Sequence, residues 1–413
     1  MKEYKALLNK NCLLLIAANI AYSFADIAFD FFLSWYVYSI TGNIMNLIAM
    51  LSGSVLFRAV LSLLTGAVTD LTNRKHLLVF SALCSIPIVL SSLLVLRYFS
   101  TVIWLYVVIV LLNDVFNVLY SKSMTTISAE LFDETTYISF NSAVSALNQS
   151  VYVIGQAAMG FILMVARDIS VISFVIACLM LTSFLISLID YQSTQKAAPT
   201  KLLGQIFSFR KKSNSYFKNL LNIAKTEVFS DSYYKSFCIV IFTLNLVYGY
   251  ISSVLPYSLS SMQGMSSAVV GLAKSMLSIG GIIGMLIVPK ISKRVTRSFI
   301  VGLVGSLISV LCIFVYSRNL ILVYIFFFFY SVFDAITQPL YSYTIKRIDA
   351  RVRGSIVGVI DFVILLASPL GMFICGALAD RNDILVEIFI IFIFTLALIL
   401  VKSSKDLNAI YLE

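Results

Sequence analysis

Twelve long apolar runs, separated by short charged or turn-forming segments, dominate this chain of 413 residues. A helix needs about 20 apolar residues to cross the hydrocarbon core of a bilayer, and inside lipid its backbone polar groups are all paired. Composition agrees, because only 12% of the residues are charged, against about 25% in soluble domains. We therefore predict an all-α polytopic membrane protein rather than a soluble enzyme, a disordered chain or a fibre. The runs cover about 12–40, 46–70, 77–96, 101–122, 138–166, 169–190, 233–260, 266–290, 298–316, 320–345, 354–380 and 383–401.

Lysine and arginine are distributed unevenly between the two sets of loops. The loops that follow odd-numbered runs contain only Arg97, Arg167, Arg318 and Arg381, out of 30 basic residues in the chain. Because basic residues gather on the cytoplasmic side, we expect both termini to lie in the cytoplasm and the protein to lie in a bacterial cell membrane. The net charge of +10 is then a signal of topology, and no nucleic-acid partner is expected.

One long basic connection divides the runs six and six. It predicts an N-terminal bundle over 1–190, a cytoplasmic linker over 191–232 and a C-terminal bundle over 233–413. The linker reads equally as an amphipathic helix on the anionic inner leaflet or as a solvated connection. The fourth run has Asp114 six residues before a Tyr-Ser pair and the tenth has Asp334 seven residues before one. These matches favour two homologous bundles, as in many transporters.

Ionisable residues inside the runs are the candidate functional groups. Each costs about 2.5–3.5 kcal/mol at the centre of a membrane on insertion scales. Most of them must therefore face a wet cavity, form a pair or be neutral. They are Asp26, Asp30, Arg58, Asp114, Lys274, Asp334 and Asp361, and the aromatic residues expected to line the same cavity are Tyr22, Phe116, Tyr248, Tyr250 and Phe333.

Asp26 and Asp30 lie four residues apart, so they share one helical face with Tyr22. Two carboxylates this close repel each other in a medium of low dielectric constant, which favours a proton on one of them. Two interpretations stay open: a site of proton coupling, or a structural ion pair between Arg58 and one of the two acids. The same alternatives apply to Asp114 and Asp334.

The last two charges are less central. Asp361 lies nearer the cytoplasmic end of its run and reads as a gating or packing acid, whereas Lys274 lies towards the outer end, from which its side chain can extend to the interface. Elsewhere, the spacing of Gly280 and Gly284 predicts a close approach between helices.

A signature loop carries the first family resemblance. Gly66-Ala-Val-Thr-Asp70-Leu-Thr-Asn-Arg74-Lys75 resembles the G-x-x-x-D-R-x-G-R-K loop of the major facilitator superfamily, with Leu71 and Asn73 as departures. The resemblance implies two six-helix bundles, alternating access and a cytoplasmic gate made by Gly66, Asp70, Arg74 and Lys75.

Further segments resemble the macrolide-efflux branch, which consists of drug:proton antiporters. They are Asp26 with Trp35 and Thr41-Gly42, Ser128-Ala-Glu130-Leu to Asn141-Ser, Arg351-x-Arg353-Gly354, and Ser368-Pro369-Leu370-Gly371 to Asp380-Arg381. The branch's antiporter motif, G-x-x-x-G-P-x-x-G-G, appears only in degraded form around Gly155 and Gly160, without its proline. The branch implies proton-driven export of amphipathic drugs.

Together these features predict a monomeric secondary transporter that exports an amphipathic cation, of macrolide or multidrug type, in exchange for protons. An exporter or flippase of an anionic or zwitterionic cargo (a siderophore, lysophospholipid or peptide) stays open, as does a non-transporting sensor or immunity protein. An intramembrane enzyme would need Asp114 and Asp334 as a carboxylate dyad and is disfavoured. We expect no cofactor and no metal, because one histidine and six scattered cysteines do not make a ligand set.

Overall fold

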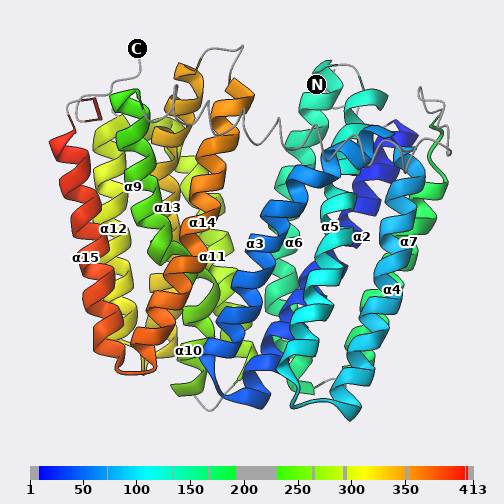
Figure 1. Ribbon diagram of the computed structural model, residues 1–413, viewed down its shortest axis with the longest axis horizontal. Helices are drawn as coiled ribbons and strands as arrows, with labels where there is room; N and C mark the ends of the chain where they lie inside the picture. Colours follow the sequence, from blue (N-terminus) through cyan, green and yellow to red (C-terminus); the bar gives the residue numbers. More distant parts are fainter. Residues whose placement is uncertain are drawn as a thin grey trace. The chain divides into compact units, whose positions relative to one another are not determined.

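Helices make up all the regular structure in the part of the chain that the computed structural model describes, residues 9–71, 73–132, 134–165, 168–191, 230–262, 266–291, 295–348, 353–404 and 406–407 (Figure 1). The predicted all-α fold class is confirmed, since each predicted run coincides with a helix. The helices are α2 (Lys10–Thr41), α3 (Ile44–Leu71), α4 (Arg74–Tyr98), α5 (Ile103–Leu131), α6 (Glu134–Val165), α7 (Asp168–Ser187), α9 (Ser232–Gly249), η3 (Tyr250–Val254), α10 (Leu255–Met262), α11 (Ser267–Ile291), α12 (Val295–Val315), α13 (Leu320–Arg347), α14 (Arg353–Ala379) and α15 (Asp383–Ser403).

Length and composition allow 11 helical spans within the described residues to cross a membrane, with α9, η3 and α10 counted as one span over Ser232–Ser261. α14 contributes a shorter apolar stretch, Ile364–Ala379, over its described portion. The helices of 25 residues and more exceed what a perpendicular crossing needs, which agrees with tilted or extended helices.

Polar residues define several helix ends. Asn9 and Asn73 act as N-caps, because their side chains accept hydrogen bonds from backbone N–H groups in the first turns of α2 and α4. At the other end of α2, Gly42 takes a left-handed conformation, with φ of 58°, and its N–H bonds the Tyr38 carbonyl. Only glycine adopts that conformation freely, so this residue determines where the helix stops.

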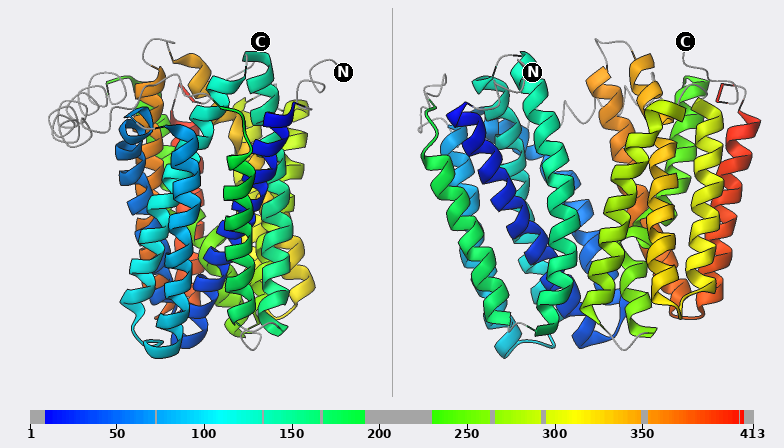
Figure 2. Two further views of the ribbon diagram at one scale, coloured as in Figure 1. Left: turned by 90° about the vertical axis from the view of Figure 1, so that its right-hand side faces the viewer. Right: turned by 180° about the vertical axis from the view of Figure 1, so that it is seen from behind.

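Contacts divide the chain into two units. The first contains residues 1–42 and 53–209, and the second contains residues 43–52 and 210–413. In the first unit, α2 lies between α6 and α7, while α4 packs against both α5 and α7 (Figure 2). α2 is therefore the central helix of its unit, which places its acidic residues inside the bundle.

In the second unit, α13 packs against both α11 and α12 (Figure 2). Glycines make both contacts close. A Cβ on Gly284 would lie 2.7 Å from the Val332 carbonyl oxygen, and one on Gly302 would lie 2.7 Å from the Phe333 carbonyl oxygen. The close approach predicted from Gly280 and Gly284 is thus observed, and it holds α13 firmly between its neighbours.

A π-helical turn interrupts the helix that begins with α9. The turn, η3, comes directly after Gly249, whose hydrogen atom faces Ser368 and Met372 of α14. Gly371 of α14 in turn packs against the backbone of Leu246. Turns of this kind are rare and often mark functional regions, and this one lies directly beyond Tyr248.

Candidate functional site

The first unit contains a buried ion triad. Arg58 of α3 donates from Nε to the Asp114 carboxylate on α5 and from Nη2 to Asp30 of α2, at 3.2 Å. The Asp114 side chain is fully buried, whereas the side chains of Arg58 and Asp30 are 36% and 41% exposed. The guanidinium therefore neutralises Asp114, which has no access to solvent, and its contact with Asp30 is the more solvent-exposed of the two.

A second group of hydrogen bonds surrounds Asp26. The side-chain N–H of Asn117 on α5 donates to Asp26 Oδ1 across 2.6 Å, and the Tyr22 hydroxyl donates to Asn117 Oδ1 across 2.5 Å. The Tyr22 ring stacks on Tyr120 with the ring centroids 3.6 Å apart. Asn117 thus joins the acid and the tyrosine predicted from one face of α2, although it belongs to a different helix.

The two groups form one electrostatic cluster, because Asp26 interacts with Asp30, Arg58 and Asp114. Three carboxylates then face one guanidinium, a formal charge of −2 when all are ionised. Nearby, Asn148 of α6 accepts hydrogen bonds from Asn19 and Ser23 of α2, which extends the polar interior along α2.

A small cavity adjoins this cluster. Its volume of about 10 Å³ is close to the minimum for one water molecule. Tyr22, Asp26 and Asn117 contribute to its wall, together with Ser85 of α4 and Asn113 of α5. A site of this size suits a proton or a water molecule, and it excludes a drug-sized substrate.

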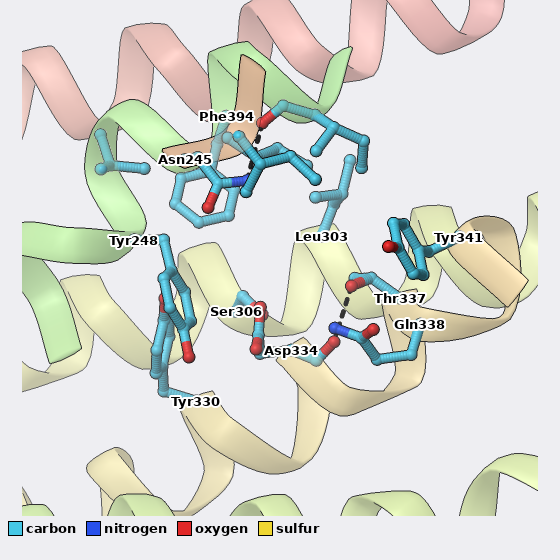
Figure 3. A pocket seen from close by; sticks show the side chains of 14 residues that line it. Asn245, Tyr248, Leu303, Ser306, Tyr330, Asp334, Thr337, Gln338, Tyr341 and Phe394 are labelled. Carbon is cyan, nitrogen blue, oxygen red and sulfur yellow. Dashed lines mark hydrogen bonds between the residues drawn. The ribbon is translucent and has the colours of Figure 1, made fainter. Parts of the chain in front are cut away.

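The second unit contains a larger cavity, of about 290 Å³ (Figure 3). Asp334 of α13 lies in its wall, and it interacts electrostatically with the hydroxyls of Tyr248 and Tyr330. Figure 3 shows these two tyrosines together on one side of the cavity and Ser306 of α12 beside Asp334. The remaining walls come from α9, α13, α14 and α15 and combine Asn245, Thr337 and Gln338 with apolar side chains.

Asp334 has no basic partner among the described residues, and none of those that line the cavity is basic. It differs in this from Asp114, the acid predicted to correspond to it in the first half, which is paired with Arg58. The surroundings of the two acids therefore differ: Asp114 forms an internal ion pair, whereas Asp334 faces a cavity.

A third polar cluster lies where α4 begins. Arg74, which is 6% exposed, forms an ion pair with Glu130 of α5, and the Tyr191 hydroxyl donates to the second oxygen of Glu130 across 2.5 Å. Lys75 donates to the carbonyl oxygens of Ser187, the last residue of α7, and of Ile189 just beyond it, at 2.9 and 2.6 Å. Arg74 and Lys75 thus fasten α5 and α7 to the start of α4.

The predicted site residues fall into separate places. Tyr22, Asp26, Asp30, Arg58 and Asp114 lie together in the first unit, and Tyr248 with Asp334 lines the cavity of the second. Of the other predicted aromatic residues, Phe116, Tyr250 and Phe333 line neither of the two cavities described. The backbones of Gly66, Asp70 and Asp361 are helical, but the side chains at these positions are not among those that the structure describes. The predicted linker lies outside the described residues between Tyr191 and Ser230.

Several residues of these sites were not predicted as functional, and three of them carry much of the geometry. Asn117, Ser306 and Tyr330 are uncharged, so a search for buried charge passes over them. Asn117 lies three residues after Asp114, one helical turn along the same face, and that spacing was the available signal. Within the described residues, there is no group of three or more histidine, cysteine or acidic side chains arranged to hold a metal ion.

The sequence matches a family model described as Major Facilitator Superfamily over residues 15–372. The chain belongs to the major facilitator superfamily. It is accordingly a multi-pass membrane transporter, which agrees with the helices described above. No curated protein matches the sequence.

Several solved structures of transporters have a fold similar to that of this chain. The nucleoside transporter NupG is similar with a TM-score of 0.74 at 12% identity, covering 96% of this chain and 99% of that one. A D-xylose-proton symporter is similar with a TM-score of 0.70 at 12% identity, covering 97% of this chain and 98% of that one. A bacterial homologue of the iron transporter ferroportin, in an inward-facing state, is similar with a TM-score of 0.69 at 13% identity. This match covers 97% of this chain and 99% of that one. At these identities the likeness concerns the fold alone.

Proposed function

We propose that this transporter exports an amphipathic, cationic small molecule in exchange for protons, by alternating access. The single observation that carries the proposal is the excess of carboxylates over cations at the interior sites. Asp26, Asp30 and Asp114 share one arginine, and Asp334 faces a cavity without a basic partner among the described residues. Protons or a cationic substrate are the species that supply the missing charge.

The energetics support coupling at these sites. An unpaired charge in a low-dielectric interior costs several kcal/mol, so an acid there holds either a proton or a cation. Moving one charge across the membrane potential supplies about 2.3 kcal/mol per 100 mV. A carrier can therefore use proton entry to expel a cation without ATP. Asp26 is the proposed proton carrier, because it accepts its hydrogen bond from the neutral amide of Asn117 rather than from a cation.

The polarity of the larger cavity disfavours an anionic cargo. Arg58 already contacts two carboxylates, and no basic residue is found among the described residues that line the cavity. A sensor or immunity protein would bind a ligand without moving it across a sealed bilayer, whereas a flippase would be distinguished by its anionic or zwitterionic cargo. We further propose that the protein is a monomer in a bacterial cytoplasmic membrane with both termini inside, that Gly66, Asp70, Arg74 and Lys75 form its cytoplasmic gate, and that Asp361 is a gating or packing acid.

Uptake into inverted membrane vesicles tests the proposal. A lipophilic cationic dye and a macrolide are offered with and without a pH gradient, to the wild-type protein and to Asp26→Asn. The matched control is Asp168→Asn, which removes an exposed acid at the start of α7. We expect gradient-driven uptake in the wild type and the control, and its loss in Asp26→Asn.

Other outcomes have definite meanings. Uptake that ignores the gradient rules out proton antiport, and unchanged uptake in Asp26→Asn reduces this acid to a structural role. If no cation is accumulated by protein that elutes as a single folded species, cationic export is wrong, and siderophores, lysophospholipids and peptides are then the cargoes to test.

A further inference from the structure

The 290 Å³ cavity of the second unit is at the lower limit of ligand pockets, which commonly measure about 300–1,000 Å³. It therefore encloses a compact group rather than a whole large drug. Its wall combines one carboxylate, three tyrosines and several amide or hydroxyl groups with aliphatic side chains. The chemistry of this wall, more than its size, indicates what it binds.

Asp334 supplies the charge. No lysine or arginine forms an ion pair with it among the described residues. The tyrosines Tyr248 and Tyr330 lie within electrostatic range of its carboxylate. Aromatic faces beside a carboxylate form a favourable environment for an organic cation, because both the ring quadrupole and the negative charge attract it.

Ser306 supplies an independent observation. It is 2% exposed and lines the cavity, and its hydroxyl has no hydrogen-bond partner among the described residues. One turn further along α12, Ser309 instead donates to the Gly305 carbonyl oxygen, at 2.7 Å. A buried hydroxyl without a partner costs stability, so its position beside Asp334 (Figure 3) indicates a partner that arrives with the ligand.

Asn245 adds an acceptor on the other wall. Its side-chain nitrogen donates to the Ile241 carbonyl oxygen within α9, at 2.9 Å, so its own oxygen is the atom that a ligand donor can reach. Thr337 likewise donates to the Asp334 backbone oxygen, at 2.6 Å. The Asn245 oxygen and the Asp334 carboxylate are therefore acceptors in the cavity wall, and they suit a ligand that carries N–H and O–H groups.

We propose that this cavity binds the protonated amine of a compact group that also carries a hydroxyl, with the ammonium at Asp334 facing Tyr248 and Tyr330 and the hydroxyl at Ser306. The inference rests on the proposed function, because it names the group by which the exported cation is held. It also divides the work between the units: substrate charge is recognised at Asp334, whereas protons are carried at Asp26.

Calorimetric titration of the full-length protein in lipid nanodiscs tests this assignment, at one pH and without a gradient. Three related probes separate its parts: tyramine carries both groups, phenethylamine lacks the hydroxyl, and 4-ethylphenol lacks the amine. We expect tyramine to bind most tightly. A charged hydrogen bond at Asp334 predicts about a 10- to 100-fold weaker affinity for 4-ethylphenol.

Two variants locate the binding. Asp334→Asn keeps the side-chain shape and is expected to remove the preference for the amine. Ser306→Ala is expected to remove the advantage of tyramine over phenethylamine, about 2- to 10-fold, while preserving the preference for the amine. Asp168→Asn serves as the control and is expected to bind as the wild type does. Size-exclusion profiles and melting temperatures confirm that each variant is folded.

The assignment is overturned if wild-type protein binds 4-ethylphenol as well as tyramine, if it binds none of the three probes, or if folded Asp334→Asn keeps the preference for the amine. Should Asp334→Asn not fold, an unchanged preference of Ser306→Ala for tyramine over phenethylamine overturns it. These results are independent of dye uptake. If uptake is driven by the gradient and depends on Asp26 but amine binding fails, the exporter stands and this site is wrong. If amines bind as expected but uptake does not depend on the gradient, the site stands and proton antiport is wrong.

Discussion

Asn117 donates a hydrogen bond of 2.6 Å to the Asp26 carboxylate, and the same side chain accepts one from Tyr22. One neutral amide thus fixes the orientation of an acid and a phenol on the neighbouring helix. An amide donates to a carboxylate without neutralising it, which is what the proposed proton exchange at Asp26 requires.

The first prediction concerns this amide. Replacing Asn117 by Ala leaves both Asp26 and Tyr22 without their partner inside the bundle, so we expect the free energy of unfolding to fall by about 1–3 kcal/mol. Titration with SDS in mixed micelles measures it. Thr125→Ala on the same helix is the control, since its exposed hydroxyl bonds only the Ser121 carbonyl oxygen; its effect should stay within about 0.5 kcal/mol. Equal effects would mean that the hydrogen bonds to Asn117 do not stabilise the bundle.

The second prediction concerns the asymmetry of the ion triad. Arg58→Met strands the fully buried Asp114 carboxylate, which should cost about 3–5 kcal/mol. The double variant Arg58→Met with Asp114→Asn should recover part of that loss, because the fully buried position then carries no charge, although Asp30 still loses its cationic partner. Asp30→Asn should cost less than about 1 kcal/mol, since this pair is more than one-third exposed on both sides. The same SDS titration provides the values, and equal losses for Asp30→Asn and Arg58→Met would contradict the assigned asymmetry.

The third prediction concerns helix packing around α13. A Cβ at Gly284 would lie 2.6 Å from Ala335 Cβ and close to the Val332 backbone, whereas one at Gly281 would meet only the Ser331 hydroxyl, at 3.3 Å. Gly284→Ala should therefore destabilise the second unit by about 1–3 kcal/mol. Gly281→Ala on the same helix should change stability by less than about 1 kcal/mol. Melting temperatures of the two purified variants compare them directly, and a more stable Gly284→Ala would show that α11 can move away from α13 at little cost.

The fourth prediction concerns the cluster at the start of α4. Glu130→Gln removes the charge that pairs with buried Arg74, and we expect a loss of about 1.5–3 kcal/mol. Tyr191→Phe removes only the hydrogen bond to the other carboxylate oxygen and should cost about 1 kcal/mol. Unfolding followed by SDS titration gives both values. A larger loss in Tyr191→Phe than in Glu130→Gln would show that the tyrosine, rather than the ion pair, holds this end together.

Much of the fold could be predicted because membrane-spanning helices are encoded by long apolar runs. The runs, the close approach at Gly284 and the enclosure of Asp26 in a bundle all follow from local pattern. The partner of Arg58 could not be predicted in this way, since it depends on which helices become neighbours. Sequence spacing left a pair with Asp26 or Asp30 open, and the structure pairs Arg58 with Asp30 and with distant Asp114.

The candidate sites were predicted in part for the same reason. A buried acid is conspicuous in an apolar run, so Asp114 and Asp334 were identified, but their different surroundings arise from the tertiary structure. Neutral residues such as Asn117 and Ser306 gain meaning only from a neighbour across the bundle. The π-helical turn after Gly249 was also not predicted, since the run from 233 to 260 continues through it without a change in hydropathy.

That π-helical turn, Tyr250–Val254, changes the angular phase of the helix in which it lies. A π turn accommodates about one residue more than an α turn, so the portion beyond it is rotated by about 100° relative to an uninterrupted helix. Tyr248 and Tyr257 therefore cannot be placed on one helical wheel. The turn is also a place where the chain can lose one residue, because a deletion there restores a regular α-helix instead of breaking one.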